Sequence, residues 1–301
     1  MTDALNATAA AKTISLTRFA GVQPRAFEAL LRHFGNVDRI LHADSGTLMA
    51  VGGMSTDLAN RISSASKSLS EAQAYVDDLH SRDIRTISRF DDDYPSLLFE
   101  LNDPPPLLYL RGQLPDTDQK TVAIVGADNA TNNGIELTVK LASMFIEAGV
   151  QLVSSLNLGI DAAVHLGARR VNGNSYTVLE TGFDHIFPEE HMSLAIDIAQ
   201  HGGAITECPP ECEYSPDRYI DANRLIVALA HAVVVTEVYR DSARMLDLLS
   251  CCSQIGKLLF LMVDPGPGAL VDEDSLNKAV SFGAIPMVGW DKVNDMVNAL
   301  V

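Results

Sequence analysis

The chain has 301 residues, of which 47% are hydrophobic and 20% charged, a composition that allows one large or two modest cores and excludes an intrinsically disordered protein. The formal net charge is −17: residues 1–85 carry nine Lys/Arg and nine Asp/Glu, whereas the rest of the chain carries 13 basic and 30 acidic residues. That acidic field opposes nonspecific binding of nucleic acid, because a phosphate backbone needs Lys and Arg to replace its counterions.

Residues 1–85 contain short helical patterns separated by glycine turns. In ISLTRFAGVQPRAFEALLRHFGN, apolar residues recur at helical spacing around Gly21, and LMAVGGMSTDLANRISSA repeats this layout around Gly53. Two such units predict a small all-α, helix-hairpin-helix domain, a module that can hold a DNA backbone through the N–H groups of its turns. We favour a simple helical interaction domain, because Gln23 and Ser55 stand where DNA-binding turns usually have a second glycine.

Residues 86–115 contain an aspartate run and three consecutive prolines, which cannot continue a helix, so we expect a linker that enters an edge strand at residues 107–110. From residue 116 to residue 301, strand and helix patterns alternate. This alternation predicts an α/β domain built on a Rossmann-like, doubly wound parallel sheet. The expected strands are Val122–Val125, Gln151–Ser154, Ser175–Leu179, Ala204–Thr206, Ala232–Thr236 and Leu258–Met262.

Ligands of such sheets lie beyond the carboxyl ends of the strands, so the residues after each strand are candidates for a binding site. After the first strand, Gly126 allows close approach of the backbone to a ligand, whereas Asp128 would repel an anion. After the second strand, serine hydroxyls and a further glycine offer similar possibilities. The candidate ligand- or DNA-binding residues in these two loops are Gly126, Asp128, Thr131, Ser154, Ser155 and Gly159.

The loops after the fourth and fifth strands carry the cationic candidates. Asn223 and Arg224 open an apolar helix and place donors and a positive charge where an anion would be welcome, which makes them the best anion-binding candidate. Ser242 and Arg244 stand at the next helix start. Arg244 can support a phosphate or pair with an aspartate at 241 or 247, and a surface pair is the commoner outcome.

Other chemistry finds little support. Asp161 and His165 are read as a helix cap and as a packed or surface histidine. Cys208 and Cys212 lack the further ligands of a zinc site, so no metal or other cofactor is expected. The chain has no HExxH, GxSxG or Walker sequence, which favours binding without catalysis.

We expect a cytoplasmic protein without membrane contact. The chain has few cysteines, no apolar block behind the amino terminus and no run of about 18 apolar residues.

In chain order, these motifs resemble the DNA-processing protein A family, DprA or Smf. YPSLLFELNDPPPLLYLRGQL is similar to the family's lead-in, YP-x-x-L-x-x-x-x-DPPP-x-L-x-x-x-G. VAIVGADNATNNG is similar to VAIVGxRxxTxYG, VSSLNLGIDAAVHLGA to VSGLAxGIDxxAHxxA, VLETGFDHIFPEEHMSLAIDI to VLGxGLDxxYPxxNxxLxxxI, and YIDANRLIVALAHAVVVTEV to FPxRNRIIAGLSxxVVVVEA. The amino-terminal helices agree with the sterile-alpha-motif-like domain that many members carry.

This resemblance implies a non-enzymatic homodimer that binds single-stranded DNA and helps to load a RecA-type recombinase during natural transformation or recombination. Several positions at the groove depart from the family pattern. Asp128 replaces an arginine, Ser155 a glycine, Asn157 an alanine and Ala222 the first arginine of RNR, and the family's SGxL is Ser-Ala-Arg-Met here. Losing phosphate contacts and gaining an aspartate predicts weakened binding to single-stranded DNA.

The alternative is a repurposed paralogue that has lost DNA binding. Its pocket would hold a nucleotide-type ligand, with Asp128 accepting ribose hydroxyls, or its acidic surface would dock a basic protein partner. A nucleoside phosphate hydrolase has the least support, because the GGxGT loop of the cytokinin-activating relatives is absent.

Overall fold

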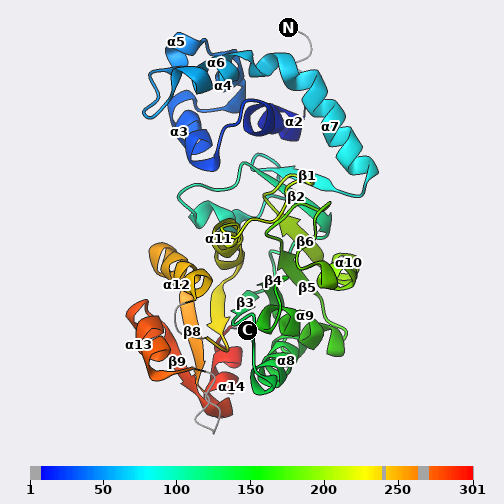
Figure 1. The fold of residues 1–301 in the computed structure, drawn as a ribbon, viewed down its shortest axis with the longest axis vertical. Helices are drawn as coiled ribbons and strands as arrows, with labels where there is room; N and C mark the ends of the chain where they lie inside the picture. Colours follow the sequence, from blue (N-terminus) through cyan, green and yellow to red (C-terminus); the bar gives the residue numbers. More distant parts are fainter. Residues whose placement is uncertain (1–7, 239–241, 264–270, 301) are drawn as a thin grey trace. The chain divides into compact units, whose positions relative to one another are not determined.

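The computed structural model describes residues 8–238, 242–263 and 271–300. The chain divides into two compact units, Met1–Leu110 and Arg111–Val301, each with its own core (Figure 1). Residues 1–7, which belong to the amino-terminal segment used to predict localisation, lie outside the described residues. So does Asp241, one of the two aspartates considered as partners of Arg244.

The first unit begins with short helices around a common apolar core. Fully buried side chains of this core include Leu16, Phe27, Leu30, Leu48 and Ile62. The helical elements are α2 (Ala9–Ile14), η1 (Ser15–Phe19), α3 (Pro24–Phe34), α4 (Val37–His42), α5 (Ser45–Leu48), α6 (Thr56–Ser64), η2 (Ala65–Ser68) and α7 (Leu69–Ser81).

Both expected helix, glycine turn, helix units are present, η1 to α3 and α5 to α6. Gly21 and Gly53 turn the chain with φ angles of 74° and 80°, a region that glycine enters without steric cost. Pro24 occupies the first turn of α3, where its missing N–H costs no helical hydrogen bond.

The lead-in segment contains two paired strands rather than one. β1 (Arg85–Ser88) and β2 (Leu107–Gly112) form an antiparallel ladder from Arg85 opposite Leu110 to Ser88 opposite Leu107. Between them lies the short helix η3 (Ser96–Glu100). The Tyr94 hydroxyl donates a 2.8 Å hydrogen bond to the Pro105 carbonyl, which ties the start of the lead-in motif to its proline run.

The second unit is the predicted Rossmann-like α/β domain. In its described residues the parallel strands are arranged in the order β6-β5-β4-β3-β7-β8-β9. Continuous apolar runs form the central strands because both faces of a parallel sheet are covered. The strands are β3 (Thr121–Val125), β4 (Gln151–Ser155), β5 (Ser175–Val178), β6 (Gly203–Thr206), β7 (Ala232–Val235), β8 (Leu258–Val263) and β9 (Ile285–Val288).

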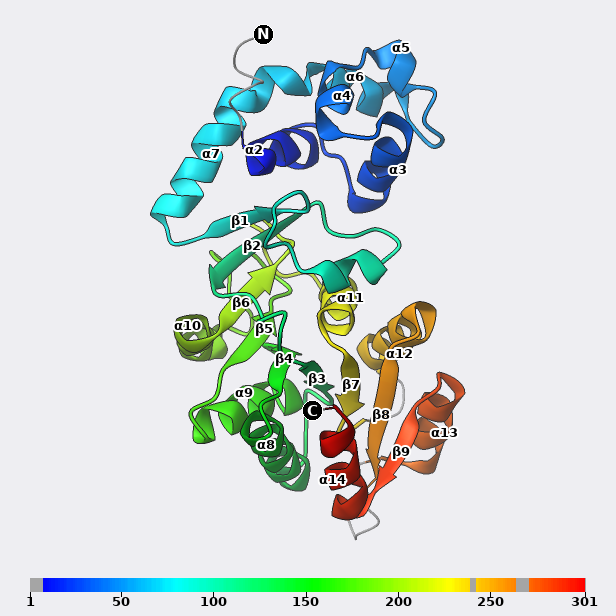
Figure 2. The same ribbon diagram turned by 180° about the vertical axis from the view of Figure 1, so that it is seen from behind.

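Helices cover both faces of this sheet. Figures 1 and 2 show α8, α9 and α10 along one side and α11, α12 and α13 along the other. The helical elements are α8 (Asn132–Glu147), α9 (Ile160–Arg170), η4 (Glu189–His191), α10 (Met192–His201), α11 (Tyr219–Leu229), α12 (Ala243–Ile255), α13 (Glu273–Ser281) and α14 (Gly289–Leu300). Strand order reverses between β3 and β7, which places the topological switch point of the sheet at their carboxyl ends.

All six expected strands are found, and each differs from its expected range by one residue at one end. β1, β9 and α14 were not expected. β9 reads IPMV, a four-residue strand with a proline, which is too short and too irregular to give a clear strand pattern. Within the described part of the chain, no helix is both long and apolar enough to cross a bilayer.

Candidate functional site

Polar side chains from the carboxyl ends of β3, β4 and β5 and from the first turn of α12 meet at the switch point of the sheet. They are linked to one another and to one side chain of α9 by hydrogen bonds and ion pairs. We call this set the carboxyl-edge network; its members are Asp128, Ser155, Asn157, Asp161, Glu180 and Arg244.

Arg244 is the cation at the centre of the network, and its side chain is only 14% exposed. Its Nη1 donates to Asp128 Oδ1 at 2.8 Å, and its Nη2 donates to Ser155 Oγ at 2.8 Å and to Asp161 Oδ2. The Nε atom lies 3.7 Å from Glu180 Oε1. One guanidinium therefore serves three carboxylates, and it is not left free to meet a phosphate.

A second chain of hydrogen bonds joins the loops after β4 and β5. Asn157 Nδ2 donates to Glu180 Oε1 at 2.7 Å and to Ser155 Oγ at 3.1 Å. Ser155 Oγ donates in turn to Asp161 Oδ2. Asp161 is fully buried, and its other oxygen accepts from the Gly126 backbone N–H at 3.4 Å. The turn after β3 thus already has a carboxylate of the protein where a ligand anion could approach it.

Burial and charge act against each other in the network. Burial alone would lower the pKa of Arg244, but Asp161 and Asp128 more than offset this and raise it, so the guanidinium stays charged. Burial raises the pKa of Glu180, and Asp161 and Asp128 raise it further, whereas Arg244 and Asn157 oppose the shift. Three carboxylates around one cation leave the network with an excess of negative charge, which disfavours an anionic ligand.

The amino terminus of α8, the other conventional anion position, is also filled from within. Glu237, fully buried after β7, accepts the Thr131 backbone N–H at 3.1 Å. Thr131 Oγ1 caps α8 by accepting from Gly134 N at 3.0 Å. A Cβ at Gly134 would lie 1.8 Å from Glu237 Oε2, so this glycine makes room for the carboxylate.

Asn223 and Arg224, the best anion-binding candidate from the sequence, are also bonded to groups of the protein. Arg224 Nη2 donates to Glu207 Oε2, in the loop after β6, and both side chains are 13% exposed. Asn223 Nδ2 donates at 2.9 Å to the Arg244 carbonyl and to Asp247 Oδ2, which fixes α11 against the start of α12. Asn223 therefore positions the backbone of Arg244.

The remaining candidate residues make contacts that stabilise or permit the fold itself. Ser154 Oγ donates to the Ile124 carbonyl at 2.7 Å inside the sheet, and Ser242 caps α12 by accepting from Met245 N at 3.2 Å. Gly126 faces α9, where an added Cβ would lie 2.6 Å from Ile160 Cγ1. Gly159, with φ 70°, passes the preceding loop so closely that a Cβ would lie 2.3 Å from the Ala127 carbonyl oxygen.

Two sequence interpretations are corrected. Arg244 does not form the expected surface pair with Asp247, because that carboxylate accepts from Asn223 and Arg244 is turned into the network. Asp161 is an acceptor in the network rather than a helix cap. His165 is packed, as one of the two interpretations had it: its Nε2–H donates to the Ser155 carbonyl and its Nδ1 accepts from Ser175 Oγ, both at 2.9 Å.

Sequence reasoning missed Glu180 and placed Glu237 only near the helix start that follows the fifth expected strand. The signal for Glu180 was present, since VLETG stands where the family pattern has VLGxG and a glycine is replaced by a carboxylate. Four members of the network, Asp128, Ser155, Asn157 and Glu180, therefore stand at departures from that pattern. Asn157 contacts Ser155 and Glu180 directly, and Arg244 joins Ser155 to Asp128, so the four side chains belong to one set of contacts.

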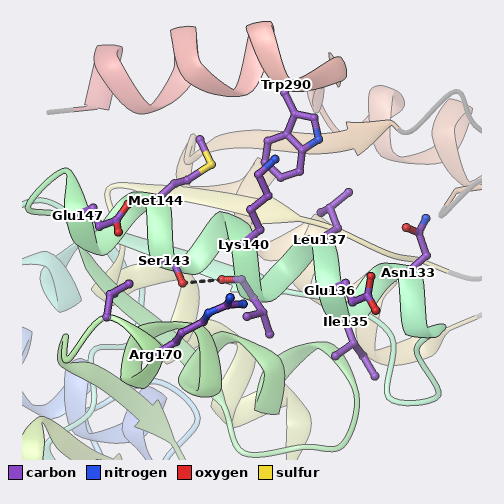
Figure 3. A pocket seen from close by; sticks show the side chains of 12 residues that line it. Asn133, Ile135, Glu136, Leu137, Lys140, Ser143, Met144, Glu147, Arg170 and Trp290 are labelled. Atoms are coloured by element: carbon purple, nitrogen blue, oxygen red, sulfur yellow. Dashed lines mark hydrogen bonds between the residues drawn. The ribbon is translucent and has the colours of Figure 1, made fainter.

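A separate hollow of about 860 Å³ lies on the outer face of α8 (Figure 3). Lys140 of α8 extends across it so that Nζ lies 3.7 Å from the centre of the Trp290 ring at the start of α14. None of the ligand-binding candidates named from the sequence lines this hollow. In the described ranges, no group of three histidine, cysteine, aspartate or glutamate side chains is placed to hold a metal ion.

A doubly wound parallel sheet with a polar cluster at its switch point defines the second unit as a Rossmann-like domain. Residues 85–298 match the family described as DNA recombination-mediator protein A, and the chain belongs to this family. It is 30% identical to the Smf protein of Synechocystis over 74% of this chain and 57% of that one, and 30% identical to the DNA processing protein DprA of Bacillus subtilis over 63% and 62%. The chain thus spans less than two thirds of the length of these curated relatives.

Solved structures agree with the fold. DNA processing protein A of Streptococcus pneumoniae matches with a TM-score of 0.76 and 24% identity, over 95% of this chain and 97% of that one. DNA processing protein A of Helicobacter pylori, whose structure describes its single-stranded DNA binding mode, matches with a TM-score of 0.61 and 23% identity, over 72% and 95%.

Proposed function

We propose that the protein is a non-catalytic DNA-processing protein that handles single-stranded DNA and assists a RecA-type recombinase, with a carboxyl-edge site altered so that DNA is held weakly there. Family membership and the single-stranded DNA binding mode described for the Helicobacter pylori relative support the first part. The pairing of Arg244 with Asp128, Asp161 and Glu180 carries the second part.

Binding of DNA phosphates at this site depends on which of its positive charges remain available. Phosphates bind where Lys and Arg replace counterions. Each lost phosphate contact lowers the slope of the logarithm of the binding constant against the logarithm of the salt concentration by about one. Here Arg244 and Arg224 are both committed to carboxylates of the protein. A DNA strand would have to compete with carboxylates that are already in place, of which Asp161 and Glu180 are buried and Asp128 is exposed.

Recombinase assistance and a homodimeric state are parts of the same proposal. Both follow from family membership, and a homodimer would double the number of DNA contacts available to one strand. Light scattering on the purified protein would measure the dimer directly. A nucleotide-type ligand is the alternative, and the Asp128 carboxylate that would accept its ribose hydroxyls already accepts from Arg244 through Oδ1.

The test is a fluorescence-anisotropy titration of a labelled single-stranded oligonucleotide at low and near-physiological salt. The wild type is expected to bind weakly and to lose the DNA as salt rises. Asp128→Arg is expected to bind more tightly and to raise the slope against salt by about one, because it adds a phosphate contact at the strand end.

Asp291→Arg makes the same charge change on α14, where Asp291 lies in the first turn, and serves as the matched control. An equal gain in both variants would show that only net charge had been measured. Absence of binding by the wild type at low salt would refute a role in holding single-stranded DNA.

A further inference from the structure

Two aromatic rings stack on each other where the loops after β5 and β6 meet. The ring centroids of Phe187 and Tyr214 lie 3.7 Å apart with 18° between the ring planes. Both side chains remain open to solvent, with exposed fractions of 38% and 42%. A stacked pair of this kind covers one face of each ring and leaves flat aromatic surface facing outward.

The two loops hold each other in position. The Gly182 backbone N–H donates to the Cys212 carbonyl and the Asp184 N–H donates to the Pro210 carbonyl, both at 2.9 Å. A Cβ at Gly182 would lie 2.1 Å from the Pro209 carbonyl oxygen, so the contact requires glycine. The ring pair is therefore presented by an ordered backbone, which lowers the entropic cost of binding a partner.

The two chain segments that carry the rings are rich in carboxylates. Residues 179–191 and 207–218 together carry eight carboxylates and one guanidinium, that of Arg218. Arg218 Nη1 lies against Cys208 Sγ at 3.6 Å, and the neighbouring Arg224 is paired with Glu207. The exposed carboxylates of these loops are Asp184, Glu189, Glu190, Glu211, Glu213 and Asp217. Such a surface repels phosphates and attracts cations.

We propose that Phe187, Tyr214 and these six carboxylates form a docking surface for an arginine-rich segment of a protein partner. A guanidinium stacks on an exposed aromatic face and pairs with carboxylates at the same time, a combination that the more strongly hydrated lysine ammonium makes less well. Charge complementarity selects this occupant over a nucleic acid, whose bases could stack on the rings but whose phosphates would meet the carboxylates. The inference goes beyond the DNA contact proposed above and does not depend on it.

The test uses the full chain and two fluorescein-labelled probes, an oligo-arginine peptide and an oligo-lysine peptide of equal length. The wild type is expected to bind the arginine peptide more tightly. Phe187→Ala/Tyr214→Ala is expected to weaken binding of the arginine peptide about tenfold and to remove the preference over lysine. Tyr214→Phe keeps the ring and is expected to bind like the wild type.

Charge is tested separately. Glu189→Gln/Glu190→Gln is expected to weaken binding of both peptides, whereas Asp291→Asn/Asp295→Asn, which removes equal charge from α14, leaves both unchanged. Equal losses in these two variants would overturn the proposal, because the peptides would then be sensing net charge alone. This comparison decides the matter even if the variant lacking both rings does not fold.

The same samples are titrated with the labelled single-stranded oligonucleotide. If loss of the rings weakens binding of the oligonucleotide and not of the arginine peptide, the rings are a base-stacking platform and the docking proposal is wrong. If the wild type binds the peptide and no oligonucleotide, the proposed DNA function fails while the docking surface stands.

Discussion

Arg244 is the residue on which the carboxyl-edge network depends, because it is the cation shared by Asp128, Asp161 and Glu180. Asp161 is fully buried and Glu180 is 8% exposed, so neither can exchange the guanidinium for water. Removing one partner of a buried ion pair leaves an uncompensated charge, which costs far more than the pair itself contributes.

Arg244→Met is therefore expected to lower the free energy of unfolding by about 3–5 kcal/mol, measured by denaturant titration. The control is Arg169→Met, since Arg169 pairs with Asp197 at 2.8 Å with both side chains 34% exposed. That change should cost less than about 1 kcal/mol, because solvent screens the pair. Similar losses in the two variants would show that the network is not held by its central cation.

At the scale of elements, α9 approaches the turn after β3 so closely that two glycines are needed. Gly126 faces Ile160, and Gly159, with φ 70° and ψ −121°, passes the Ala127 carbonyl oxygen. This approach is what brings Asp161 within reach of the Gly126 N–H and of Arg244. The close packing of α9 thus positions the network.

Gly159→Ala is expected to destabilise the protein by more than about 3 kcal/mol, because the added methyl group combines a strained backbone with a clash against fixed carbonyl oxygens. Gly149→Ala is the matched control. Gly149 has φ 81°, yet nothing lies within 4 Å of an added Cβ, so only the backbone term of about 1 kcal/mol applies. Thermal or chemical unfolding of both variants measures the difference, and equal losses would contradict the packing argument.

The elements were more predictable from the sequence than the site. Buried runs such as those of β3 and β4 show their strands directly, because a parallel sheet requires apolar side chains on both faces. The partners of Arg244 lie up to 116 positions away, at Asp128, and no local pattern encodes that pairing. Glu180 could have been noticed as a carboxylate at a glycine position, but its contact with Asn157 required the register of β4 and β5.

At the scale of the whole molecule, acidification has two opposing effects. Protonating carboxylates relieves the repulsion expected from a net charge of −17. His165, fully buried between α9 and the sheet, acts in the opposite direction: burial lowers its pKa to about 4, from 6.5 in the unfolded chain. The stability that neutral His165 contributes is complete above pH 6.5 and is lost as the pH falls toward 4, because the unfolded chain binds the proton first.

His165→Gln is expected to make the free energy of unfolding less dependent on pH between pH 6.5 and 4. Glutamine can still donate to the Ser155 carbonyl and accept from Ser175, but it does not titrate. The pH-dependent loss of unfolding free energy between pH 6.5 and 4 should be smaller in the variant by up to about 3 kcal/mol. If the free energy of unfolding depends on pH in the same way in both proteins, His165 does not cause the loss of stability in acid.

The contacts of the carboxyl-edge network also make its members depend on one another. Arg244 without the carboxylates would be a buried lone cation, and Glu180 without Arg244 and Asn157 would be a buried anion with neither counter-charge nor amide donor. Either change alone would therefore leave an uncompensated buried charge and lower the free energy of unfolding. The buried members of the network thus act as one cooperative unit, in which each charge is tolerated only because the others are present.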